Sequence, residues 1–137
     1  MEIRRLSLRA GAEAARGTGV IIDVFRAFTC APLLLHLGAR RLILAAEIAA
    51  CLAWRGRAIL VGEQDERPIA GFDLTNSPWQ ILAAARTMFT GRTVVLRTTS
   101  GVTGALIALA HCEDVLLASF ANARASADYL RARRPAL

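Results

Sequence analysis

The stretch "VIIDVFRAFTCA" (residues 20–31) decides how the rest of the chain is interpreted. Residues 20–24 are largely β-branched and apolar, which is typical of a short strand covered on both faces of a parallel sheet. Asp23 interrupts this strand near its end, and Arg26 and Thr29 follow at the start of a helical pattern. In open parallel sheets, ligands bind outside the carboxyl ends of the strands, where helix N-termini favour anions. The junction therefore predicts half of an anion and metal site.

Strand and helix patterns alternate along the chain. Regular alternation implies parallel pairing with right-handed crossovers. We therefore predict a single α/β domain over residues 1–137, with a layered α/β/α architecture and a mainly parallel sheet built from repeated βαβ units. The predicted strands are residues 2–8 (an edge strand, with a loop over 11–19 after it), 20–24, 41–45, 58–62, 93–97 and 114–118. The predicted helices are 27–38, 47–56, 101–110, 122–133 and one that starts at Ser77 with Pro78 and Gln80 in capping positions.

The sequence also contains an internal repeat. When it is shifted by 74 positions, the segment from Val20 lies over the segment from Val94, and Asp23 and Arg26 meet Arg97 and Ser100. Both segments have the pattern of a strand, a helix and a second strand. The internal repeat predicts a duplicated βαβ unit. Any two βαβ units share this periodicity, however, so the similarity could also arise without duplication.

The charge and the apolar content of the chain indicate which kinds of partner to expect. The net charge is +6, and all 17 basic residues are arginine, which favours a small phosphorylated or sulfonated anion. No basic run exceeds two residues and aromatic residues do not interleave, so we expect no nucleic-acid partner. No apolar run reaches the roughly 18 residues of a membrane span, and the first residues lack a signal-peptide pattern, so we expect a cytoplasmic protein that binds no membrane. The apolar content of 55% favours a homo-oligomer.

Polar side chains gather directly after the predicted strands. Such positions meet at one edge of a parallel sheet, so we expect them to share a single rim. Three carboxylates, an arginine and a hydroxyl-rich turn would suit a divalent cation, which prefers oxygen ligands, together with a phosphate group. The residues are Asp23, Arg26, Glu63, Asp73, Asn76, Ser77, Asn122 and the turn of Thr98, Thr99, Ser100 and Gly101.

Each of these features also has a purely structural interpretation. Asp23 could cap the following helix, Ser77 could only start one, and the turn at residues 98–101 could be a capped strand-to-helix connection. Other chemistry lacks support, because the sequence contains no GxGxxG, GxxxxGK[ST], HExxH or GxSxG motif.

Five ordered segments resemble the 2-phosphosulfolactate phosphatase family. They are "VIIDVFRAFT" from Val20, "GE" at Gly62, "GFDLTNSP" from Gly71, "TTSG" from Thr98 and "SFANA" from Ser119. The resemblance implies a Mg²⁺-dependent phosphatase that acts on 2-phosphosulfolactate in coenzyme M biosynthesis. It spans roughly residues 19–127, and family members are usually longer than this chain, so the domain is expected to be truncated relative to the family.

The resemblance also implies roles for individual residues. Asp23, Glu63 and Asp73 are the candidates for holding the metal and its water, with Asp23, Arg26 and Asp73 in catalytic positions. Substrate binding would involve Arg26, Asn76, Ser77, Thr98, Thr99, Ser100, Gly101 and Asn122. Because Thr75 and Ser100 depart from the residues usual in the family, and because the chain is short, the alternative is an inactive or repurposed member that serves as an anion-binding or assembly module.

Overall fold

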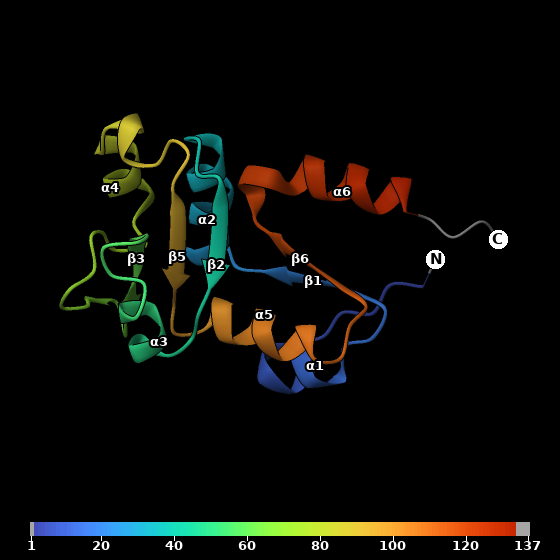
Figure 1. Ribbon diagram of the computed structural model, residues 1–137. Coiled ribbons are helices and arrows are strands. Elements are labelled where there is room, and N and C mark those ends of the chain that lie inside the picture. Colours follow the sequence, from blue (N-terminus) through green and yellow to red (C-terminus); the bar gives the residue numbers. More distant parts are fainter. Residues whose placement is uncertain (1, 134–137) are drawn as a thin grey trace.

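The computed structural model of the chain describes residues 2–133 and alternates helices with strands (Figure 1). The α/β class predicted from the sequence is confirmed. In chain order, the elements are α1 (Leu8–Ala14), β1 (Thr18–Ile22), α2 (Ala27–His36), β2 (Arg41–Leu44), α3 (Ile48–Leu52), β3 (Ile59–Gln64), β4 (Arg67–Pro68), α4 (Pro78–Ala83), the 3-10 turn η1 (Arg86–Met88), β5 (Thr93–Arg97), α5 (Gly101–Leu109), β6 (Asp114–Ala118), the 3-10 turn η2 (Phe120–Asn122) and α6 (Ala123–Ala132).

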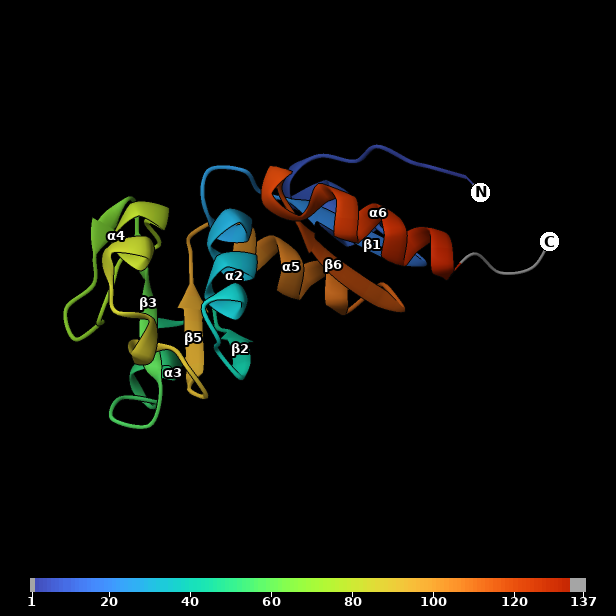
Figure 2. The same ribbon diagram turned by 90° about the horizontal axis from the view of Figure 1, so that it is seen from above.

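The strands divide between two sheets (Figure 2). The larger sheet has the order β2-β5-β3-β4, and the smaller one pairs β1 with β6. Every pair is parallel except the short β3–β4 hairpin. Leu96 lies opposite both Leu44 and Val61, so the carboxyl ends of β2, β3 and β5 reach the same edge of the large sheet.

The two predicted βαβ units are interleaved rather than placed side by side. In the internal repeat, β1 and β5 are the first strands of the two units, and β2 and β6 are their second strands. In the structure, β1 pairs with β6 and β2 pairs with β5. Each sheet therefore joins the first strand of one unit to the second strand of the other, and neither sheet contains both strands of one unit.

Apolar side chains cover both faces of the large sheet. The main core lies on one face, draws side chains from α2, α4 and the start of α5, and contains Phe28, Leu34, Phe89 and Leu96, all fully buried. A smaller cluster under α3 includes Cys51, Leu60 and Val95 on the other face. Successive residues of β3 and β5 enter opposite clusters, so both strands are buried on both sides, as their continuous apolar runs predicted. Helix α6 lies on one side of the β1–β6 sheet and α5 on the other (Figure 1).

The N-terminal segment differs from its prediction. Residues 2–7 form no strand, α1 covers the first part of the segment expected to be a loop, and β1 begins within its last part. The alternating pattern finds no neighbouring strand to pair with, and Ile3 stays 75% exposed. The alanine-rich residues that follow favour a helix, and α1 gains its packing from α5.

Within residues 2–133, no helix is both long enough and apolar enough to cross a membrane.

Candidate functional site

A pocket opens at the carboxyl edge of the large sheet, beside the start of α5. We call it the rim pocket. It brings together Asp23 and Arg26 from the β1–α2 loop, the end of β3, and the turn that follows β5, although these segments are far apart in the sequence. Its lining residues are Asp23, Phe25, Arg26, Glu63, Asp65, Glu66, Asn76, Thr98, Thr99, Ser100 and Gly101.

Glu63 is the most firmly held carboxylate of the pocket. It is 5% exposed and lies at the end of β3. Its Oε1 accepts a hydrogen bond from the Thr99 backbone N–H (2.9 Å), and its Oε2 accepts one from the Glu66 backbone N–H (2.7 Å). The Thr99 hydroxyl adds a contact of 3.3 Å to Oε2. These bonds fix the carboxylate between β5 and the β3–β4 hairpin, so its charge is preorganised.

Asp23 lies against the N-terminus of α5. Its backbone N–H donates to Ala118 O (3.1 Å), which ties the β1–α2 loop to the end of β6. Burial raises the pKa of Asp23, and the negative charge of Glu63 raises that pKa further, while the backbone amides of Ala27 and Phe25 oppose the shift. Asp23 and Glu63 therefore interact electrostatically, and a cation beside them would favour the ionised form of both.

Gly101 permits this close approach of Asp23. A Cβ at position 101 would overlap Asp23 Oδ2 and would lie 2.9 Å from Ala27 Cβ. Any larger residue would force Asp23 and the start of α2 away from α5. The glycine that the sequence placed in the turn is thus required by packing.

Asn76 supplies an oxygen without a partner. The residue is 4% exposed, lines the rim pocket, and its Oδ1 has no hydrogen-bond partner among the described residues. Its backbone carbonyl accepts a contact of 3.1 Å from Cys30 Sγ, which anchors the segment to α2. Burial raises the pKa of Cys30 to about 12, so this thiol is a packing group and not a nucleophile. A buried carbonyl oxygen without a donor is suited to a cation.

The pocket also contains groups that are suited to an anion. Arg26 is half-buried, and Ser100 and Gly101 begin α5, a nine-residue helix. The Thr98 hydroxyl accepts from the Val102 backbone N–H (3.1 Å) and so caps this helix. The Thr99 amide is already bonded to Glu63, which leaves the amides of Ser100 and Gly101 to face a bound oxyanion.

Three residues predicted for the site do not line the rim pocket. The Asp73 carboxylate accepts from the Leu60 backbone N–H (2.7 Å) and holds the chain beside β3. Ser77 caps α4 by accepting from the Gln80 backbone N–H (3.5 Å). Asn122 accepts from the Ser119 backbone N–H (2.9 Å) and donates to Leu117 O (2.8 Å), forming a capping box.

The expected set of three carboxylates is consequently not assembled. Within residues 2–133, no group of three or more His, Cys, Asp and Glu side chains is arranged to hold a metal ion. The rim pocket unites Asp23 and Glu63, and Asp73 lies elsewhere. The oxygen that accompanies the two carboxylates is Asn76 Oδ1.

Sequence reasoning missed Asp65 and Glu66. The sequence predicted no strand or helix between residues 63 and 76, but this segment contains a hairpin whose two turn residues have left-handed φ angles of 49° and 64°. Two-residue turns of this geometry favour Asn-Gly or Asp-Gly. Asp65 fits the first position, but Glu66 stands where Gly is favoured, so the sequence lacked the usual turn pair. The turn adds two carboxylates to the mouth of the rim pocket.

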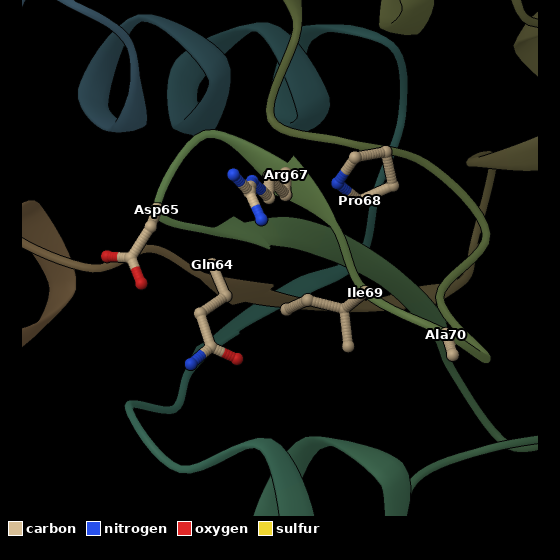
Figure 3. A pocket seen from close by; sticks show the side chains of 6 residues that line it. All are labelled: Gln64, Asp65, Arg67, Pro68, Ile69 and Ala70. Atoms are coloured by element: carbon tan, nitrogen blue, oxygen red, sulfur yellow. The ribbon is translucent and has the colours of Figure 1, made fainter.

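A second hollow lies beside the same hairpin and has a different lining. Figure 3 shows its side chains, which are Gln64, Asp65, Arg67, Pro68, Ile69 and Ala70. Only Asp65 borders both hollows. With one carboxylate and none of the predicted site residues, this hollow offers little catalytic chemistry, and the rim pocket is the better candidate site.

The comparisons with known proteins agree with the motifs that converge on the rim pocket. A model of the 2-phosphosulpholactate phosphatase family matches residues 7–136. The chain belongs to this family. Within the family, relatives named probable 2-phosphosulfolactate phosphatase include a Deinococcus radiodurans protein, 40% identical over 111 residues that cover 79% of this chain and 45% of the relative.

Other members of the 2-phosphosulfolactate phosphatase family show the same coverage. A Thermus thermophilus protein of the same name is 37% identical over 113 residues, covering 82% of this chain and 46% of the relative. One from Thermotoga petrophila is 35% identical over 121 residues, covering 88% of this chain and 51% of the relative. The chain therefore spans about half the length of the relatives it matches.

Proposed function

We propose that the rim pocket is the site of a cytoplasmic, Mg²⁺-dependent phosphatase that hydrolyses a small anionic phosphate ester such as 2-phosphosulfolactate. The family and the names of the relatives support the reaction class. The observation that carries the proposal is that two interacting carboxylates and an unpaired buried amide oxygen line the same pocket as Arg26 and the start of α5.

Three residues that line the pocket fit a Mg²⁺ ion. Asp23 and Glu63 offer carboxylate oxygens, and Asn76 offers its unpaired Oδ1. These are the hard oxygen ligands that Mg²⁺ prefers, and one or two carboxylates are a usual number for this ion. When bound, Mg²⁺ would neutralise negative charge and lower the pKa of a coordinated water, which makes the water a better nucleophile.

Arg26 and the start of α5 would bind the phosphate ester. Arg26 can donate to two oxygens of a phosphate or sulfonate group at once. The amides of Ser100 and Gly101 would stabilise negative charge that develops on the phosphoryl oxygens. Glu63 is held by three hydrogen bonds, so we assign it a fixed role in holding the cation, which Asp23 would share.

Phosphate release from a panel of phosphorylated hydroxy acids, with and without Mg²⁺, tests the proposal directly. The parent chain should release phosphate only with Mg²⁺, and the Asp23→Asn and Glu63→Gln variants should be at least about a hundredfold slower. A folded sample that turns over none of the esters would exclude the activity for this chain.

The second candidate is a family member without catalysis, which serves as an anion-binding or assembly module. The observation that favours it is the placement of Asp73 outside the pocket, so that one of the three carboxylates that the resemblance implied lies away from the site. Calorimetry with sulfolactate separates the two candidates, because this module predicts binding without any hydrolysis.

We also propose that the chain forms a homo-oligomer. Ile22, Phe25 and Phe120 follow or end the strands of the small sheet and are 71%, 92% and 84% exposed. Large apolar side chains grouped at one sheet end are typical of contact surfaces. Sedimentation of the parent chain and a Phe25→Ser/Phe120→Ser variant tests this, since a parent that sediments as a monomer contradicts it.

A further inference from the structure

A strongly basic surface lies at the amino-terminal edge of the large sheet, opposite the rim pocket. Three segments reach this edge, residues 36–44, 53–58 and 84–93, and they contain six arginines and no aspartate or glutamate. The Arg40 backbone N–H donates to Arg92 O (2.9 Å), which brings the first and third segments together. We call this surface the arginine edge; it consists of Arg40, Arg41, Arg55, Arg57, Arg86 and Arg92.

The excess charge of the whole chain is concentrated there. The chain has 17 basic and 11 acidic residues, so removing these six leaves 11 of each sign. All six side chains are exposed, and within residues 2–133 none of them forms an ion pair. Arg57 and Arg86 donate only to backbone carbonyls, at 2.7 and 3.3 Å. Such a field favours an acidic partner.

Trp54 organises the centre of the arginine edge. The Cζ atoms of Arg57 and Arg41 lie 5.0 and 5.7 Å from the centroid of its ring. Trp54 itself packs against the small core under α3, so the ring is a fixed platform. Guanidinium groups held over an aromatic ring keep their N–H groups free for carboxylates, and less side-chain entropy is lost when they bind.

We propose that the arginine edge docks an acidic segment of a partner protein, which makes it an interaction surface separate from the proposed phosphatase site. Nucleic-acid grooves combine basic residues with aromatic rings that are free to stack on bases. Here the Trp54 ring already carries guanidinium groups, and the other aromatic residue of these segments, Phe89, is fully buried. The exposed chemistry is therefore that of guanidinium forks, which match carboxylates.

Fluorescence anisotropy with a labelled hexaglutamate peptide tests this docking at low ionic strength. The parent should bind the peptide, and added salt should weaken the binding. Arg41→Gln/Arg57→Gln should weaken it about fivefold to twentyfold, the value expected for two exposed charge pairs. In a Trp79→Phe background, binding should also change the fluorescence of Trp54.

The matched control is Arg124→Gln/Arg131→Gln, which removes the same charge from exposed positions of α6. It should stay within about twofold of the parent. Absence of peptide binding by the parent, or equal weakening in the two double variants, would overturn the proposal. So would tighter, Arg41-dependent binding of a single-stranded oligonucleotide of equal charge. If the first double variant does not fold, Arg40→Gln/Arg92→Gln replaces it, because neither residue lies over Trp54.

Discussion

Replacing Gly101 with alanine tests whether Asp23 really packs against α5. The structure leaves no room for the added methyl group, which would overlap Asp23 Oδ2 and approach Ala27 Cβ to 2.9 Å. Ala27 is fully buried at the start of α2, so it cannot move away freely. The Asp23 side chain must then turn out of the rim pocket, or α2 and α5 must separate.

Two opposing contributions set the size of the effect. Alanine is favoured over glycine in a helix by up to roughly 1 kcal/mol. Overpacking a buried contact costs roughly 1–3 kcal/mol. We therefore expect Gly101→Ala to lower the free energy of unfolding by about 1 kcal/mol. The displaced Asp23 should also abolish stabilisation by Mg²⁺, which for an intact site would reach roughly 2.7 kcal/mol at a hundred times the Kd.

Urea unfolding with and without Mg²⁺ measures both effects, and Gly104→Ala is the matched control. Gly104 lies in the same helix, and a Cβ there would meet only Ile21 Cγ2 at 4.0 Å. The control should therefore be as stable as the parent or more stable, and should keep its response to Mg²⁺. If Gly101→Ala behaves like Gly104→Ala in both measurements, Asp23 does not lie where the structure places it, and the assembly of the rim pocket is wrong.

Three further substitutions separate structural from catalytic roles. Burial raises the pKa of Asp23 above its ordinary 3.8, so the ionised carboxylate destabilises the fold. Without Mg²⁺, Asp23→Asn should therefore have a higher melting temperature than the parent near neutral pH. This difference should disappear as the pH falls below the ordinary pKa, because the carboxyl group is then protonated in both the folded and the unfolded chain. Asp73→Ala removes the 2.7 Å hydrogen bond from the Leu60 amide and should lower the free energy of unfolding by about 1–2 kcal/mol. It should leave Mg²⁺-dependent phosphate release intact. A loss of turnover in a folded variant would contradict the placement of Asp73 outside the rim pocket. Thr99→Val removes the hydroxyl that contacts Asp65 N (3.1 Å) and Glu63 (3.3 Å), so turnover should fall severalfold, and Thr99→Ser should restore it.

The strands of the core could be predicted because their signal is local. The runs at 93–97 and 114–118 coincide with β5 and β6, since continuous apolar residues have few alternatives to a buried strand. The start of α4 was also predictable from a local signal, because Ser77 caps this helix as predicted. Gln80 departs from the prediction, because its Oε1 accepts from the Thr75 backbone and hydroxyl (3.1 and 2.7 Å) and not from the N-cap amide. The nearby threonine competes for the same acceptor.

Asp73 shows why the site was only partly predictable. The sequence placed it among the polar residues that were expected to share one rim with Glu63. In the structure, Leu74 forms a bridge with Val61, which carries the returning chain alongside the middle of β3. Asp73 therefore lies beside Leu60, three residues before Glu63, or about 10 Å along the strand. Which strand residue the loop returns to is a tertiary property that a linear pattern does not encode.

The charges of the rim pocket give a physical reason for cation and substrate to bind together. Asp23, Glu63, Asp65 and Glu66 line it against one guanidinium, that of Arg26, because Arg97 donates its N–H groups to the Ala46 and Glu63 carbonyls and to Thr99. A doubly negative ester alone would meet net repulsion in this pocket, while a divalent cation would be attracted to it. The carboxylates that would hold the cation thus also repel the ester, and the bound cation would neutralise this repulsion. We therefore expect the cation to bind first and the ester second.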